Sequence, residues 1–162
     1  MSDQDTLAGR PRILIVDDSR IVRATVRKHL AENYDMIEEA DGEAGWRRLL
    51  ADETVSLLIS DLSMPELDGL EAIGLVRARG LDTPIIMISG ARGEDYAVRT
   101  MRAGAQDFIP KSNLTRLLPA LARELAEAES RRRRAQAEEA RRELEERFRA
   151  TFEQAAVGMA HV

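Results

Sequence analysis

Three unbroken apolar runs constrain the fold of this 162-residue chain more than any other feature: "ILIV" (13–16), "VSLLIS" (55–60) and "PIIMIS" (84–89). Runs of this length with no polar alternation are typical of strands that are buried on both faces, as in a parallel sheet. "YDMIEEA" (34–40) predicts a weaker edge strand and "DFI" (107–109) a very short one. The sequence therefore predicts five strands.

Amphipathic segments separate these strands, over residues 19–31, 42–51, 67–79 and 94–103. In the first of them, Ile21, Val22, Val26 and Leu30 fall on one helical face. Five strand–helix units in succession predict an α/β fold: a parallel sheet with helices on both faces, joined by right-handed crossovers.

Composition excludes several classes of protein. Cysteine is absent, which rules out disulfides and thiolate metal sites and fits a cytoplasmic protein. The polar, acidic start "MSDQDTLAGRP" does not resemble a signal peptide, and no apolar run approaches the roughly 20 residues that span a bilayer. The formal net charge of −5 argues against non-specific nucleic-acid binding, whose usual footprint is basic, so no nucleic-acid partner is expected, and the lack of a spanning run predicts no membrane partner.

The last helix is predicted to continue far beyond the domain, to about residue 150, with Pro119 as its only proline. A 4-3-4-3 apolar spacing, typical of a coiled-coil seam, is formed by Leu114, Leu118, Leu121, Leu125 and Ala128. A second register follows, on Ala137, Ala140, Leu144 and Phe148, with a stutter near 130–136. Two interpretations are open: a solvated single helix with i,i+4 ion pairs, or the favoured parallel homodimer through residues 114–150.

Charged and polar side chains follow four of the strands. Asp17 and Asp18 end the first strand, Asp61 the third and Ser89 the fourth, and Lys111 follows the fifth. The carboxyl ends of parallel strands share one edge of the sheet, so these side chains are expected to converge there. Two like charges about 4 Å apart repel by roughly 4 kcal/mol at an effective dielectric of 20, so the three carboxylates predict a bound cation, best Mg²⁺.

A carboxylate nucleophile beside Mg²⁺, a lysine and a hydroxyl predicts phosphoryl transfer. Asp61 would attack phosphorus and become an aspartyl phosphate. Mg²⁺ and Lys111 would neutralise the phosphoryl oxygens, and the Ser89 hydroxyl would donate to one of them.

With these residues identified, residues 11–113 resemble the receiver domain of two-component response regulators, through "LIVDDS", "SDLSMPELDG", "PIIMISG" and "AGAQDFIPK". The resemblance implies a flavodoxin-like, doubly wound (βα)5 fold. It also implies that Asp61 is the phospho-acceptor and Asp18 a direct Mg²⁺ ligand, with Asp17 acting partly through water. The carbonyl of Ser63 would be a further metal ligand.

The resemblance also assigns a switch and partners. Ser89 would be the switch hydroxyl, Phe108 the switch aromatic and Lys111 the phosphoryl partner. The phospho-donor would be a histidine kinase or a phosphotransfer protein, and the domain would promote its own phosphorylation and dephosphorylation without being a conventional enzyme. One departure is that Ser112, and not proline, follows Lys111, so the Lys111–Ser112 peptide is expected to be trans.

We therefore expect a disordered tail over 1–10, a receiver domain over 11–125, a helical coiled-coil linker over 126–150 and, over 151–162, the truncated start of a PAS-like domain. The missing output would be a histidine kinase or a cyclic-dinucleotide enzyme. One alternative is a receiver-like dimerisation module that is not phosphorylated. Another, a phosphatase of the haloacid-dehalogenase type, is disfavoured because its nucleophile ends the first strand as Asp-x-Asp.

Overall fold

The computed structural model describes residues 9–64, 67–90 and 94–160. Residues 1–8 of the predicted tail lie outside this range. The elements in chain order are β1 (Arg12–Val16), α2 (Arg20–Leu30), β2 (Asp35–Glu39), α3 (Gly42–Ala51), β3 (Val55–Asp61), β4 (Ser63–Met64), β5 (Leu67–Asp68), α4 (Gly69–Ala78), β6 (Ile85–Ser89), α5 (Glu94–Ala103), β7 (Asp107–Pro110), the 3-10 helix η1 (Lys111–Arg116) and α6 (Leu117–Ala160).

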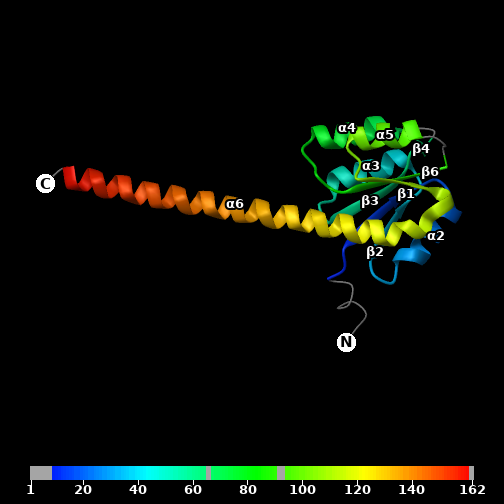
Figure 1. Ribbon diagram of the computed structural model, residues 1–162, viewed down its shortest axis with the longest axis horizontal. Helices are drawn as coiled ribbons and strands as arrows, with labels where there is room; N and C mark the ends of the chain where they lie inside the picture. The colour runs from blue at the N-terminus through cyan, green and yellow to red at the C-terminus, as the bar shows by residue number, and fades with distance from the viewer. Residues whose placement is uncertain (1–8, 65–66, 91–93, 161–162) are drawn as a thin grey trace. The chain divides into compact units, whose positions relative to one another are not determined.

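Five of the strands form one parallel sheet in the order β2-β1-β3-β6-β7. Helices α3 and α4 lie on one side of this sheet and α2 on the other (Figure 1). This is the predicted doubly wound arrangement, and residues 34–40 supply an edge strand as expected. The sequence did not predict β4 and β5, a pair of two-residue antiparallel strands between β3 and α4.

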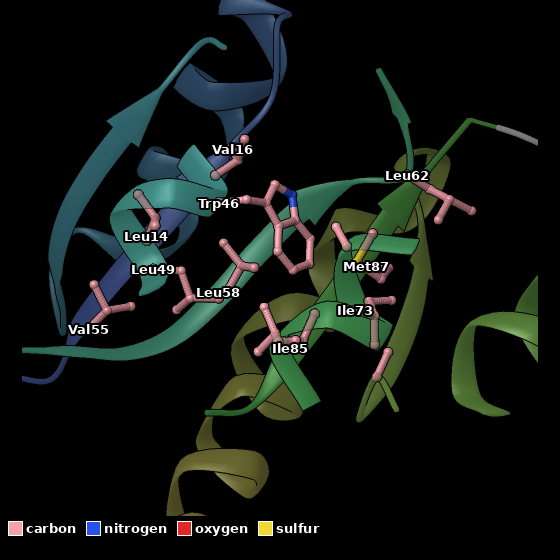
Figure 2. Close-up of a cluster of buried hydrophobic side chains, with 13 residues drawn as sticks. Leu14, Val16, Trp46, Leu49, Val55, Leu58, Leu62, Ile73, Ile85 and Met87 are labelled. Atoms are coloured by element: carbon pink, nitrogen blue, oxygen red, sulfur yellow. The ribbon is translucent and has the colours of Figure 1, made fainter. Parts of the chain in front are cut away.

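The sheet is buried on both faces, which explains the unbroken apolar runs. Successive residues of β1 alternate between two core clusters: Leu14 and Val16 in one, Ile13 and Ile15 in the other. The first cluster joins the sheet to α3 and α4, with Trp46 packed among the strand side chains (Figure 2). The second joins it to α2 and to the start of α6.

Local residues set the starts of the helices. The hydroxyl of Ser19 accepts a hydrogen bond from the backbone N–H of Val22, so Ser19 is the N-cap of α2. Asp41 and Asp68 accept equivalent bonds at the starts of α3 and α4. None of the helices in the described part of the chain combines the length and hydrophobicity that a bilayer span requires.

The last α-helix begins at Leu117, so Leu114, the first position of the predicted seam, lies before it. Asn113 has non-helical dihedral angles, and residues up to Arg116 form the 3-10 helix η1. Pro119 lacks a backbone N–H and is accommodated in the first turn of α6.

The predicted seam leucines pack inside their own domain. Leu114 and Leu121 belong to the second core cluster, and Leu125 packs against it, whereas Leu118 is 37% exposed. The sheet of the same chain therefore covers three of the five seam positions, so their apolar spacing does not require a second chain, and the homodimer through residues 114–150 stays a prediction.

The chain consists of two compact units, Met1–Ala126 and Glu127–Val162. The first contains the sheet and both core clusters. In the second, the described residues are all helical, and every described side chain from Arg132 to Met159 is exposed.

Candidate functional site

The ends of β1 and β3 bring the carboxylates together. The two strands are neighbours in the sheet, and Val16 pairs with Ser60, so Asp17 and Asp61 follow at the same level. Asp17, Asp18 and Asp61 each offer one carboxylate oxygen within 4.8 Å of the others. The predicted convergence of these three residues is thus present in the structure.

The cluster is buried on one side and open on the other. Asp17 is fully buried and Asp61 is 3% exposed, while Asp18 lies at the surface. Burial raises the pKa of Asp17, and the nearby charge of Asp61 adds to that effect. The hydrogen bond from the Ser19 N–H and the nearby Lys111 ammonium act in the opposite direction without cancelling the rise.

Each buried carboxylate is held in the same way. The main-chain N–H two residues later donates to one oxygen: Ser19 to Oδ1 of Asp17 at 2.8 Å, and Ser63 to Oδ1 of Asp61 at 3.2 Å. The other oxygen, Oδ2, faces Lys111 in both cases. These contacts fix the rotamers of both side chains before any ligand binds.

Lys111 reaches both carboxylates from the end of β7. Its Nζ lies 3.1 Å from Oδ2 of Asp61, to which it donates a hydrogen bond, and 3.1 Å from Oδ2 of Asp17. The second contact is an ion pair without hydrogen-bond alignment, which leaves Oδ2 of Asp17 buried and without a hydrogen-bond partner. Burial works against the charged ammonium, but the two carboxylates raise the pKa of Lys111.

Lys111 reaches the site although Ser112, and not proline, follows it. The described residues contain no cis peptide, so the Lys111–Ser112 bond is trans as predicted, and Lys111 begins η1 directly after β7. The sequence did not predict that Lys111 would bridge Asp17 as well as Asp61. No local motif carries that signal, because the contact joins residues far apart in the chain.

Ser89 lies on β6, which is next to β3, and Phe108 lies on β7, which is next to β6. Ser89 is the last residue of β6. The residue before it, Ile88, pairs with Asp61 on β3, and Ser89 itself pairs with Pro110 on β7. Its side chain is 1% exposed. Phe108 is half-buried and packs against the core cluster that contains Trp46.

The donor set suits a hard divalent cation. Three carboxylates carry three negative charges, and Lys111 supplies one positive charge within contact distance. Mg²⁺ binds through one or two carboxylates and keeps several waters, and the exposure of Asp18 leaves room for them. Oδ2 of Asp17 is buried without a hydrogen-bond partner, and the positive charge that it faces is that of the Lys111 ammonium, 3.1 Å away.

Comparison with known proteins identifies the class. The family model for the response regulator receiver domain matches residues 13–122, so the chain belongs to that family.

Individual relatives agree with this assignment. The response regulator MprA of Mycobacterium ulcerans is 36% identical over 100 residues, which cover 62% of this chain and 43% of MprA. The chain therefore aligns with less than half the length of this curated relative. The receiver domain of a putative LuxO repressor from Vibrio parahaemolyticus superposes with a TM-score of 0.70 at 26% identity, covering 75% of this chain and 95% of that one. A CheY-like receiver protein from Methanospirillum hungatei gives 0.68 at 26% identity, covering 76% and 99%.

Proposed function

We propose that this receiver domain accepts a phosphoryl group on Asp61 and that Mg²⁺ is required. The observation that carries the proposal is the Asp61 carboxylate itself: nearly buried, 3.1 Å from Lys111 Nζ and grouped with Asp17 and Asp18. The donor would be a phosphohistidine on a histidine kinase or a phosphotransfer protein, because the family is that of two-component signalling.

In the proposed reaction, a carboxylate oxygen of Asp61 attacks phosphorus, and an aspartyl phosphate forms. The bond from phosphorus to the donor imidazole nitrogen breaks, and its electron pair returns to that nitrogen. Lys111 is placed to neutralise a phosphoryl oxygen, since its Nζ already contacts the carboxylate that reacts. Ser63 keeps Asp61 oriented through its backbone N–H.

Asp17, Asp18, Asp61 and the backbone carbonyl of Ser63 would hold the metal. When bound, Mg²⁺ supplies positive charge that stabilises the equatorial phosphoryl oxygens in the transition state. Asp17 would act partly through water, with its Oδ1 held by the Ser19 N–H and its Oδ2 facing the Lys111 ammonium.

The signal would leave through Ser89 and Phe108. Ser89 would move toward the phosphoryl group and donate a hydrogen bond from its hydroxyl to one oxygen, and Phe108 would turn into the space that is released. Both residues lie on strands next to the reacting carboxylate or to each other. The repacking would reach the start of α6, whose residues Leu117 and Leu121 belong to the second core cluster. The PAS-like start over 151–162 stays a prediction, and residues 161–162 lie outside the described range.

Intact-protein mass spectrometry tests the proposal. Incubation with acetyl phosphate and Mg²⁺ should add one phosphoryl group, and chelation of the metal or Asp61→Asn should abolish the addition. An unmodified chain under all conditions would favour the alternative, a dimerisation module that is not phosphorylated. That alternative was prompted by the missing proline after Lys111, and the contact of Lys111 with both carboxylates weakens it.

A further inference from the structure

An arginine near the end of α4 binds the segments that lead into two strands of the sheet. Arg77 is half-buried, and its guanidinium donates to the backbone carbonyl of Gly104 from Nε at 3.0 Å and from Nη2 at 2.9 Å. It also donates to the carbonyl of Leu81 at 2.8 Å and to Oε1 of Gln106 at 2.9 Å. Leu81 precedes β6, and Gly104 and Gln106 precede β7. The planar guanidinium fork fixes these groups relative to one another.

Gln106 is joined to the first residue of β6 in two ways. Its backbone N–H donates to the carbonyl of Ile85 at 2.8 Å, and the N–H of Ile85 donates to Oε1 of Gln106 at 2.7 Å. Ile85 is fully buried, so an unpaired N–H there would be costly. Because the same Oε1 accepts from Arg77, one side-chain oxygen connects α4 with the beginning of both strands.

Strand β7 gains from such a fixed point because its own pairing is short. It has four residues, and β6 is its only neighbour in the sheet. The register runs from Ile86 and Asp107 to Ser89 and Pro110, and proline has no N–H to donate to a ladder. Few backbone hydrogen bonds therefore resist a shift of β7 along β6, and the contacts of Gln106 add to them.

The position of β7 along β6 decides where Lys111 lies. Lys111 follows β7 directly, and its Nζ is 3.1 Å from Oδ2 of Asp17 and 3.1 Å from Oδ2 of Asp61. One residue along a strand is about 3.3 Å, so a shift of β7 by a fraction of a residue would lengthen both contacts. The carboxylates themselves follow β1 and end β3, and β7 pairs with neither strand.

We propose that Arg77 and Gln106 are positioning residues: through Ile85 they fix β7 on β6 and thereby hold Lys111 against the carboxylates of the site. Where it concerns the reaction of Asp61, this inference rests on the proposed function. Gln106 stands five residues before Lys111, about 16 Å away along an extended strand, so it acts on the site only through the strand.

A double-mutant cycle by urea unfolding in EDTA tests the positioning without any phosphorylation. It compares the parent with Gln106→Leu, Lys111→Met and the double variant. Residues so far apart, with no shared partner, normally have additive effects on stability. The proposal predicts coupling instead: Lys111→Met should shift the urea midpoint at most about half as much in the Gln106→Leu background, because the ammonium has already left the carboxylates. Equal shifts in the two backgrounds would overturn the proposal.

Three further variants separate positioning from a general loss of stability. Gln106→Glu keeps an acceptor oxygen for Ile85 and Arg77, so the full effect of Lys111→Met should return in its background. Arg77→Lys keeps the charge and loses the fork, and it should show the same coupling as Gln106→Leu even if that chain fails to fold. Arg79→Met is the matched control, because Arg79 is exposed just after α4. Coupling of equal size in the control would contradict the proposal.

Intact-protein mass spectrometry with acetyl phosphate and Mg²⁺ measures the consequence for the reaction. Gln106→Leu should lower the rate constant for phosphorylation of Asp61 at least about tenfold, since misplacement of a reacting group by about 1 Å can cost about a hundredfold. Gln106→Glu should restore the rate. A Gln106→Leu protein that reacts as fast as its parent would overturn the proposal. A parent that is never modified would count against the proposed function, and the urea cycle would still decide the positioning.

Discussion

Replacement of Lys111 by methionine removes the one cation that contacts the acidic cluster among the described residues. Its Nζ lies 3.1 Å from a carboxylate oxygen of Asp17 and 3.1 Å from one of Asp61. At an effective dielectric of 20, each contact amounts to about 5 kcal/mol of Coulomb energy. Most of this is offset, because the partly buried ammonium has lost hydration that it regains on unfolding.

We therefore expect Lys111→Met to lower the free energy of unfolding by about 2–4 kcal/mol in the absence of divalent metal. The loss arises because Asp17 and Asp61 are then left buried and close together with no neighbouring positive charge. Methionine retains most of the aliphatic length of lysine, so packing changes little. Mg²⁺ at millimolar concentration should recover most of the loss, since the ion supplies the missing charge.

Urea unfolding in EDTA and in Mg²⁺ measures both effects, with Trp46 fluorescence as the probe. Lys28→Met is the matched control, because Lys28 is the only other lysine and is exposed on α2. A Lys111→Met protein as stable as its parent in EDTA would refute the electrostatic account of this site. Equal losses in EDTA and in Mg²⁺ would refute the part of it that concerns the metal.

Three further substitutions test the fold that positions the site. Gly104→Ala should cost about 1–3 kcal/mol, because Gly104 has φ +118° and a Cβ there would lie 2.9 Å from Cγ of Arg77. Leu121→Ala should cost about 3 kcal/mol, because Leu121 is fully buried in the second core cluster. Thr54→Val should destabilise the protein at neutral pH, with a difference that shrinks in acid, because the hydrogen bond from the Thr54 hydroxyl lowers the pKa of Asp52 and is lost in this variant.

Urea and acid titrations check these three expectations against matched controls. Gly80 has φ +78° with open space around it, so Gly80→Ala should cost less than Gly104→Ala. The partly exposed Leu118 should tolerate alanine better than Leu121 does. The reverse order in either pair would contradict the packing described here.

The pKa of Asp52 in the folded protein lies below its ordinary value of 3.8, so its interactions stabilise the fold above pH 3.8. This stabilisation is lost as the pH falls through the lowered pKa. A Thr54→Val deficit that persists unchanged in acid would contradict that assignment.

Much of the sheet and of the acidic cluster could be predicted because the signals are local. An unbroken apolar run predicts a strand buried on both faces, and an aspartate directly after it falls at the carboxyl edge of the sheet. Asp17 and Asp61 follow this rule, and the register of β1 and β3 places them at one level. The backbone N–H groups of Ser19 and Ser63 then orient them.

The partner of an apolar helix face could not be predicted in the same way. Leu114 and Leu121 have the spacing of a coiled-coil seam, yet the same spacing serves a helix that packs on its own sheet. Periodicity tells which face is apolar and does not identify what covers that face. The bridge from Lys111 to Asp17 was missed for a related reason: it depends on a loop path that no local motif specifies.

The most direct test of the central claim is to locate the phosphoryl group. The phosphorylated protein is reduced with borohydride, which converts an acyl phosphate on aspartate to homoserine, and its peptides are sequenced by mass spectrometry. The proposed reaction predicts homoserine at position 61, dependent on Mg²⁺ and absent when the donor is omitted. Modification at Asp17 or Asp18 instead, or labelling that is unaffected by removal of the metal, would contradict it.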